Sequence, residues 1–300
     1  MRDRGVVLIN ALVIVLAISA IAAALLARSH SARLRAGHSQ VSQQLGLYLD
    51  GIETLMPQLL RPIENGTAVH PGQGWAAPNL TYPIDRGAVD ARMSDLQGRL
   101  NVNWLMVEDE FADAVFAQVF AELRLPQSLL AEIRAFVSSG GPGSVDGYLA
   151  RKVPVLPGGG PLRDLEELRA VAGMTPAHFA TMQAAFSALP RDTRLNLNTA
   201  PKPVLSAVLE PFPPELRSEI LARDTPINNI SELRQRVIEI LETEEVDHLP
   251  FDRLTVSSRF FAADLAARLE GVVRQRRVII AINPIESPAT RVIYRWAKYD

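Results

Sequence analysis

The chain of 300 residues contains no cysteine, which excludes disulfides, thiol nucleophiles and thiolate zinc sites. The chain also lacks a large net charge of either sign. The formal net charge is −2, so no general attraction to nucleic acid or anionic lipid is expected. The catalytic patterns H-E-x-x-H and G-x-S-x-G do not occur, and the five histidines are scattered. These absences favour a protein that is not an enzyme.

A long apolar run stands near the N-terminus. Val6 to Ala27 contains no charged residue and no proline, and as a helix it would span roughly 33 Å, enough to cross a bilayer core. A secretory signal peptide has a shorter apolar core and a break before the cleavage site. An ordinary single-pass anchor is the second interpretation. A third interpretation depends on the residues that precede the run.

Those preceding residues form a very short charged leader, Met1 to Gly5. It resembles the class III leader of type IV pilins and type II secretion pseudopilins. The resemblance implies that a prepilin peptidase cuts after Gly5, which leaves Val6 as the mature N-terminus. Most members of that family have a glutamate at the fifth mature position, whereas this chain has Asn10. The K component of the minor pseudopilins characteristically lacks this glutamate.

The helical pattern continues beyond the apolar run. An apolar stripe recurs every three, four or seven residues and includes Val41, Leu45, Tyr48, Ile52, Leu55 and Leu59. One helix over residues 6–56 would be roughly 75 Å long. We expect Pro57 to bend or end it and Pro62 to close it.

Residues 66–87 are rich in glycine and proline and predict a long loop. Alternation over 89–93 predicts a strand, residues 95–98 a turn, and residues 100–103 a second strand. The segment from Ser94 to Leu105 reads SDLQGRLNVNWL. It resembles a motif of the K pseudopilins whose matching positions are Asp95, Gln97, Gly98, Asn101 and Asn103.

Residues 108–249 have a helical pattern with several paired helices. Asp164, with Glu167 three residues later, and Thr175-Pro176 have the pattern of helix starts. Thr199 is a further expected N-cap, within the sequence LNLNTA. This sequence resembles a second family motif, matched by Asn196, Asn198, Thr199 and Ala200.

The helical pairs also resemble helix-hairpin-helix modules, so a membrane-anchored DNA receptor is an alternative function. Two features oppose it. The second hairpin reads Pro211-Phe212-Pro213-Pro214, and proline lacks the amide donors that such modules use on phosphates. Acidic residues also outnumber basic ones between 161 and 225, which does not suit DNA binding. We therefore expect no nucleic-acid partner.

Metal binding is left open only for calcium. The K family carries a run of acidic and aromatic residues near positions 135–140, and this chain lacks the carboxylates of that run. Asp146 and Tyr148 match the part of the family pattern that follows it. Two acidic groups, within 108–113 and 242–247, have no complete calcium-loop pattern and are interpreted as solvated helix ends. We expect no metal ligand and no cofactor apart from a structural calcium ion.

Strand patterns return after Pro250, over residues 255–269, 272–282 and 291–296, with a turn at Glu270-Gly271. Arg274, Arg276 and Arg277 form the main basic cluster. It is interpreted as a solvated strand face, with a surface for a partner as the alternative.

The order of these segments resembles the K minor pseudopilin of type II secretion. The fold expected is α+β: a long transmembrane helix on a small antiparallel, pilin-like sheet, with a large inserted all-α domain. The expected division is a leader over 1–5, a membrane helix over 6–27, pilin-like parts over 28–105 and 250–300, and the insertion over 106–249. A minor pilin of a related type IV system is the other interpretation of this order.

The resemblance implies a single-pass protein of the inner membrane, with its bulk in the periplasm. Its implied partners are the other minor pseudopilins, the major pseudopilin and the prepilin peptidase. Its implied role is to cap the pseudopilus tip and support protein secretion.

Overall fold

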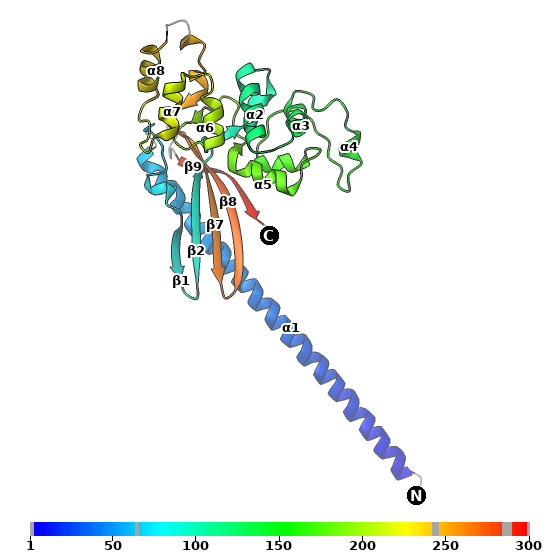
Figure 1. Cartoon of the computed structure of the whole chain (residues 1–300). Coiled ribbons are helices and arrows are strands. Elements are labelled where there is room, and N and C mark those ends of the chain that lie inside the picture. Colours follow the sequence, from blue (N-terminus) through cyan, green and yellow to red (C-terminus); the bar gives the residue numbers. More distant parts are fainter. Residues whose placement is uncertain (1–2, 64–65, 242–245, 284–289, 299–300) are drawn as a thin grey trace.

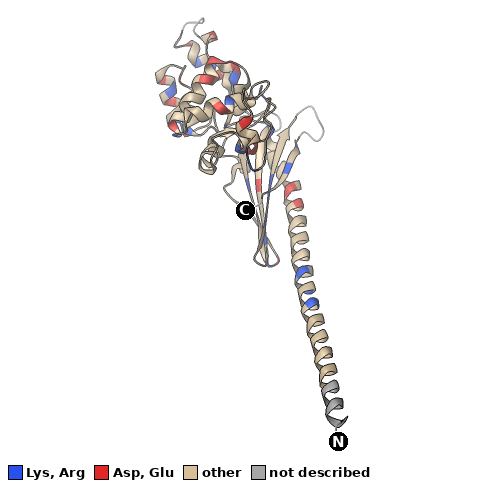
Figure 2. Ribbon diagram, turned by 90° about the vertical axis from the view of Figure 1, so that its right-hand side faces the viewer, with Lys and Arg blue, Asp and Glu red and all other residues tan. Residues whose placement is uncertain are grey.

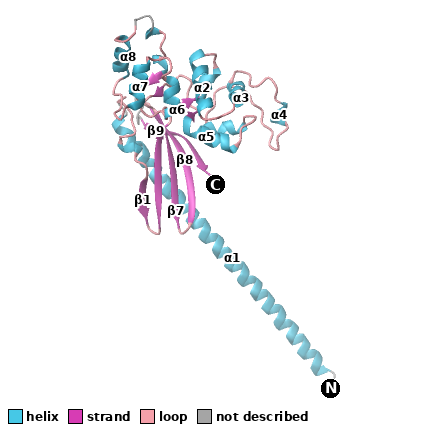
Figure 3. Cartoon of the chain, in the orientation of Figure 1, coloured by secondary structure: helices cyan, strands magenta, loops and turns pink. Residues whose placement is uncertain are grey.

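The computed structural model describes residues 3–63, 66–241, 246–283 and 290–298. One long helix, a five-stranded sheet and a group of short helices make up the molecule (Figure 1). The sheet packs on the second half of the long helix. The short helices gather at the end of the sheet that is far from the N-terminus (Figure 3).

The long helix α1 runs from Asp3 to Leu60. Its first part lies free of the rest of the protein, with side chains such as Leu12 and Leu16 more than half exposed. It is the one helix among the described residues that is long and apolar enough to cross a membrane, and it fits a single-pass anchor. From Leu12 to Ala27 it carries no charge, and basic side chains follow (Figure 2).

The second half of α1 is buried on one face. The buried side chains recur every three or four residues, which places them along one stripe facing the sheet: Leu45, Leu49, Ile52, Met56 and Leu60. Pro57 was expected to bend or end the helix, and it does not end it, because α1 continues to Leu60. The α-helix gives way to a short 3-10 turn over Arg61–Ile63, which contains Pro62, the residue expected to close it. Packing of Met56 and Leu60 against the sheet offsets the backbone hydrogen bond that proline cannot donate.

The sheet is antiparallel throughout, in the order β1-β2-β7-β8-β9. Its strands are β1 Leu80–Ile84, β2 Gly87–Asp95, β7 Phe260–Leu269, β8 Val272–Ile282 and β9 Thr290–Lys298. The helical domain is inserted between β2 and β7, which pair directly with each other. The predicted turn at Glu270 and Gly271 joins β7 to β8, and both residues have the positive φ that a tight hairpin of this kind requires.

Two expectations for the first half of the chain were wrong. The predicted loop over 66–87 contains β1, an edge strand. Pro83 is tolerated there because no strand of the described residues pairs with the outer side of β1. The predicted strand over 100–103 does not pair with β2. Only Leu100–Asn101 is extended, as β3, and it pairs in parallel with β4, Phe186–Ser187; the next residues, Val102–Met106, form the 3-10 helix η3.

The inserted domain is mainly helical and has its own core. Its helices are α2 Glu110–Glu122, α3 Gln127–Val137, α4 Asp146–Leu149, η4 Leu165–Ala170, α5 Pro176–Ala185, α6 Lys202–Val208, α7 Pro214–Ala222 and α8 Ile230–Ile238. Phe116, Phe120 and Phe186 pack edge-on or tilted at its centre. A parallel pair of short strands, β5 Leu195–Asn196 and β6 Leu254–Thr255, closes the domain where the chain returns to the sheet.

Capping residues behave as predicted at two helices and not at a third. Asp164 and Glu167 form the expected capping box at η4, and Thr175 caps α5 ahead of Pro176. Thr199 does not cap a helix, because α6 begins after Pro201. The side chain of Thr199 turns instead toward β2.

Candidate functional site

The residues of the two family motifs meet where β2 leaves the sheet. Residues 95–103 lead from β2 into the inserted domain. Residues 195–200 come after helices α2 to α5 in the sequence and lie beside residues 95–103. Most of these polar side chains are buried. We call this region the junction, because it joins the inserted domain to the sheet.

Asp95 is the centre of the junction and accepts four hydrogen bonds. Its Oδ1 accepts from the backbone N–H of Gln97 at 2.8 Å. Its Oδ2 accepts from Asn196 Nδ2 at 3.0 Å and from the hydroxyls of Thr199 and Ser258 at 2.6 Å each. Burial raises the pKa of Asp95, and these four hydrogen bonds act in the opposite direction. No lysine or arginine forms an ion pair with Asp95 in the described part of the chain.

Asn196 and Gln97 connect the junction to three further segments. Asn196 Nδ2 also donates to the carbonyl of Val69 at 3.1 Å and to Ser258 at 2.8 Å. Gln97 Oε1 accepts from the backbone N–H of Arg259 at 2.6 Å, and its Nε2 donates to the carbonyl of Arg194 at 2.9 Å. Each side chain therefore ties together backbone segments that are 60 to 160 residues apart in the sequence.

Gly98 is required by close packing. A Cβ atom at this position would lie 2.4 Å from Thr199 Oγ1 and 2.5 Å from the carbonyl oxygen of Thr199. Both distances are far shorter than a van der Waals contact. Any side chain at position 98 would push the two motif segments apart.

The other motif asparagines hold loops of the inserted domain. Asn101 Nδ2 donates to the carbonyl of Pro190 at 2.9 Å. Asn103 exchanges hydrogen bonds with the backbone of Leu162 at 2.8 and 2.9 Å and donates to the carbonyl of Leu189. Asn198 donates to the backbone carbonyl of Ile227 and accepts from its backbone N–H. Ala200 is partly buried against the core of the inserted domain.

The junction is built to hold the domain in place. Its polar atoms have hydrogen-bond partners within the protein, which is the condition for burying them without a large cost in stability.

Across the described residues, no three His, Asp or Glu side chains gather where they could hold a metal ion. Tyr148 of the calcium-associated pattern is buried and donates to Glu132 Oε1 at 2.6 Å, and burial raises its pKa to about 12.

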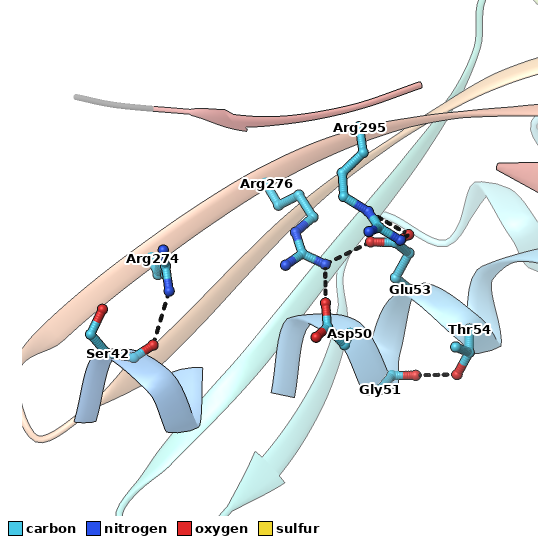
Figure 4. A network of polar contacts seen from close by, with 8 residues as sticks. All are labelled: Ser42, Asp50, Gly51, Glu53, Thr54, Arg274, Arg276 and Arg295. Carbon is cyan, nitrogen blue, oxygen red and sulfur yellow. Dashed lines mark hydrogen bonds and ion pairs between the residues drawn. The ribbon is translucent and has the colours of Figure 1, made fainter. Parts of the chain in front are cut away.

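A second polar network fastens α1 to the sheet (Figure 4). Glu53 is nearly fully buried and accepts from Arg276 Nη1 at 2.7 Å and from Arg295 Nε at 2.9 Å. Arg276 also reaches Asp50 at 2.6 Å, and Arg274 donates to the carbonyl of Ser42 at 3.0 Å. A solvated strand face was therefore the wrong interpretation for Arg276, because α1 supplies acceptors that the sequence of β8 alone does not reveal. Arg274 is exposed, as that interpretation predicts.

The first of the two predicted acidic groups, within 108–113, forms ion pairs inside the protein. Asp109 caps α2 and pairs with Arg253, while Asp113 pairs with Arg134. This first group therefore contributes to intramolecular ion pairs as well as to a helix end. Residues 242–245 of the second group lie outside the described residues.

The predicted processing positions lie at the far end of the molecule from the junction. Gly5, Val6 and Asn10 all have helical backbone within α1. The cleavage after Gly5 and the role of Asn10 stay predictions.

The arrangement of elements defines the class of protein. A long N-terminal helix, half of it free and half packed on an antiparallel sheet, is a pilin-like architecture, here with a helical domain inserted between two strands. The crystal structure of the GspK-GspI-GspJ complex from the type 2 secretion system of enterotoxigenic Escherichia coli contains a chain of this fold. It superposes with a TM-score of 0.72 at 21% identity, over 89% of this chain and 100% of that one.

Sequence comparisons identify the family. The family model described as type II secretion system (T2SS), protein K matches residues 98–191, which begin inside the junction. The type II secretion system protein K of Pectobacterium carotovorum subsp. carotovorum is 29% identical over 231 residues, covering 69% of this chain and 70% of the relative. That of Klebsiella pneumoniae is 28% identical over 235 residues, covering 72% of each. Part of the sequence and the fold of the whole chain thus match the protein K of type II secretion systems, which confirms the resemblance found in the sequence.

We predict that Gly98→Ala destabilises the protein by about 1–3 kcal/mol, because the added methyl group overpacks the contact with Thr199. The measurement is the Tm of the full chain in detergent micelles, followed by tryptophan fluorescence. Gly147→Ala is the matched control, because nothing lies within 4 Å of a Cβ atom there. Equal Tm values for the two variants would contradict the close approach at position 98.

Asp95 gives a pH dependence whose sign follows from its raised pKa. Its contribution to stability is fully present below the unfolded pKa, ordinarily 3.8, and is lost as the pH rises through the higher folded value. Asp95→Asn keeps the shape of the side chain but carries no titrating proton. We expect the wild type to lose stability relative to Asp95→Asn as the pH rises across this window. Parallel Tm profiles from about pH 3 to pH 8 would show that burial does not raise the pKa.

Proposed function

We propose that this minor pseudopilin caps the periplasmic tip of the type II pseudopilus, together with other minor pseudopilins, and so supports secretion of folded proteins across the outer membrane. The observation that carries the proposal is the position of the inserted domain. It lies at the end of the sheet farthest from the N-terminus of α1 (Figures 1 and 2). A filament subunit needs room above it for the next subunit, and a bulky domain at this end would take that room.

The proposed location is the inner membrane, with the sheet and the inserted domain in the periplasm. The free apolar part of α1 supports a membrane anchor. In this proposal the prepilin peptidase removes residues 1–5, and α1 then packs beside the helices of the major pseudopilin. The solved complex of GspK with GspI and GspJ supports minor pseudopilins as partners of this chain. The role is one of assembly and transport, without a catalytic step.

Asn10 fits the tip position on physical grounds. A charged side chain within a bilayer is costly unless it is paired. In ordinary subunits the glutamate at this position is thought to pair with the N-terminal amine of a neighbouring subunit. A subunit at the tip has no subunit above it whose amine needs a carboxylate. A neutral amide then avoids burying an unpaired charge.

The tip position can be tested by labelling, because the natural chain contains no cysteine. A Ser144→Cys variant places one thiol on an exposed loop of the inserted domain. After gold labelling of isolated pseudopili, electron microscopy is expected to find particles at one end of each filament. The unsubstituted chain is the control and should take no label. Gold distributed along the filaments would overturn the capping role.

We further predict that Asn10→Glu lowers both secretion and co-purification with partner pseudopilins, because it places an unpaired carboxylate in the membrane. Asn10→Gln, which stays neutral, is the control and should behave as the natural chain. N-terminal sequencing of all three chains should begin at Val6, which shows that processing is intact. Unchanged secretion by Asn10→Glu would mean that the tip role does not need a neutral residue at this position.

A further inference from the structure

A groove of 710 Å³ lies between the inserted domain and the face of the sheet that α1 does not cover. Ligand sites commonly have volumes of about 300–1,000 Å³ and mostly apolar walls. The sheet contributes Phe260, Ile279, Ile293 and Trp296, and the inserted domain contributes Leu162 and Leu165 among others. This groove is distinct from the junction, although both lie where the two domains meet.

Two arginines face this apolar groove. Arg277 belongs to the predicted basic cluster, but it points to the opposite face of β8 from Arg276, and its Nη1 lies 3.8 Å from Asp264 Oδ1. Arg99 comes from the turn after β2 and donates to Ser94 Oγ at 3.5 Å. No carboxylate of the described residues lies within 4 Å of the Arg99 guanidinium. Burial lowers the pKa of Arg99 and the charge of Arg277 acts in the same direction, while Asp264 and Asp95 act in the opposite one.

The other charged residues that line the groove lie at the start of η4. Burial raises the pKa of one of them, Asp164, and the charge of Arg277 acts in the opposite direction. Asp164 accepts from the backbone N–H of Glu166 at 2.6 Å as part of the capping box. Glu166 pairs with Arg169 and accepts from Gln183 Nε2 at 3.1 Å. Arg163 lines the same part of the groove and is exposed.

Among the described residues, three arginines, Arg99, Arg163 and Arg277, line the groove together with only two carboxylates, those of Asp164 and Glu166. Both carboxylates already accept hydrogen bonds beside η4, and Asp264 lies near Arg277. The lining therefore carries more positive than negative charge, which favours an incoming carboxylate.

The groove runs along a strand with an open edge. β9 is the last strand of the sheet, and no strand of the described residues pairs with its outer side. Such an edge offers backbone N–H and C=O groups to an extended segment from another protein. Tyr294 lies on this strand, lines the groove and is 46% exposed.

We propose that this groove binds an extended segment of a neighbouring minor pseudopilin. The segment pairs with β9 and places a carboxylate between Arg99 and Arg277. An apolar side chain beside that carboxylate packs against Phe260 and Trp296. This inference rests on the proposed function and adds to it the surface and the chemistry by which the chain recognises its partner.

The test is photo-crosslinking in secreting cells, with a photoreactive amino acid in place of Tyr294 in the full chain. Tyr82 on β1 is the matched control position, because it lies on the opposite edge of the sheet with similar exposure. We expect an adduct from position 294 and none from position 82. Mass spectrometry of the adduct should identify a minor pseudopilin, joined at a segment that contains Asp or Glu.

Variants that remove one positive charge test whether the partner binds through the arginines or only lies near position 294. Arg99→Gln and Arg277→Gln should each lower the adduct yield about tenfold, because each removes a hydrogen bond to a charged group. Arg277→Lys keeps the positive charge and should restore much of the yield. Arg92→Gln, an exposed position on β2, is the matched control. Tm values measured for each variant show whether it folds, and the lysine variant keeps the test valid if a glutamine variant does not.

Co-purification of the natural chain with the minor pseudopilins distinguishes the two proposals. If they co-purify but position 294 forms no adduct with them, or forms one with a secreted protein, the groove proposal is overturned and the proposed function stands. An adduct that is unchanged by both glutamine variants overturns the carboxylate site. If the natural chain does not co-purify with any minor pseudopilin, the proposed function fails, and the groove proposal fails with it.

Discussion

Asp95 is the buried carboxylate on which the rest of the structure depends. A helical domain inserted into a sheet is connected by only two chain crossings, and without further contacts it would turn freely about them. Asp95 stands at the first crossing, and Ser258 stands at the second. Asn196 and Thr199 reach the same carboxylate from within the inserted domain. One side chain therefore receives hydrogen bonds from both crossings and from the domain that they connect.

The Asp95 carboxylate is surrounded by neutral hydrogen-bond donors, because a buried carboxylate needs hydrogen bonds to be stable. A buried carboxylate without partners would be destabilising, and an arginine partner would itself need to be desolvated. Hydroxyl and amide donors avoid that second cost. Gln97 and Gly98 extend the same arrangement, the first by bonding two backbone segments and the second by allowing the chains to approach. The family model begins at residue 98, so the junction includes the start of the region that is similar across the protein K family.

The charged side chains on the two faces of the sheet are paired to different extents. Glu53 is buried between α1 and the sheet, and Arg276 and Arg295 supply its counter-charges, so that face is complete within the chain. On the other face Arg277 and Arg99 have weaker acceptors, and the groove beside them stays open. This difference agrees with a protein whose helix and inserted domain are held rigidly while another surface is left for assembly.

The sequence by itself determined the features that depend on neighbouring residues. The apolar run of α1, the caps at Asp164 and Thr175, and the hairpin at Glu270 and Gly271 follow from local periodicity and backbone preference, and the family motifs were recognised by their order. Tertiary structure alone decided the parallel pairs β3–β4 and β5–β6, the role of Thr199 and the partners of Arg276. The physical reason is sequence distance. These contacts join residues about 60 to 230 positions apart, and a side chain such as Thr199 has equally good local and distant acceptors until the fold brings Asp95 within 2.6 Å.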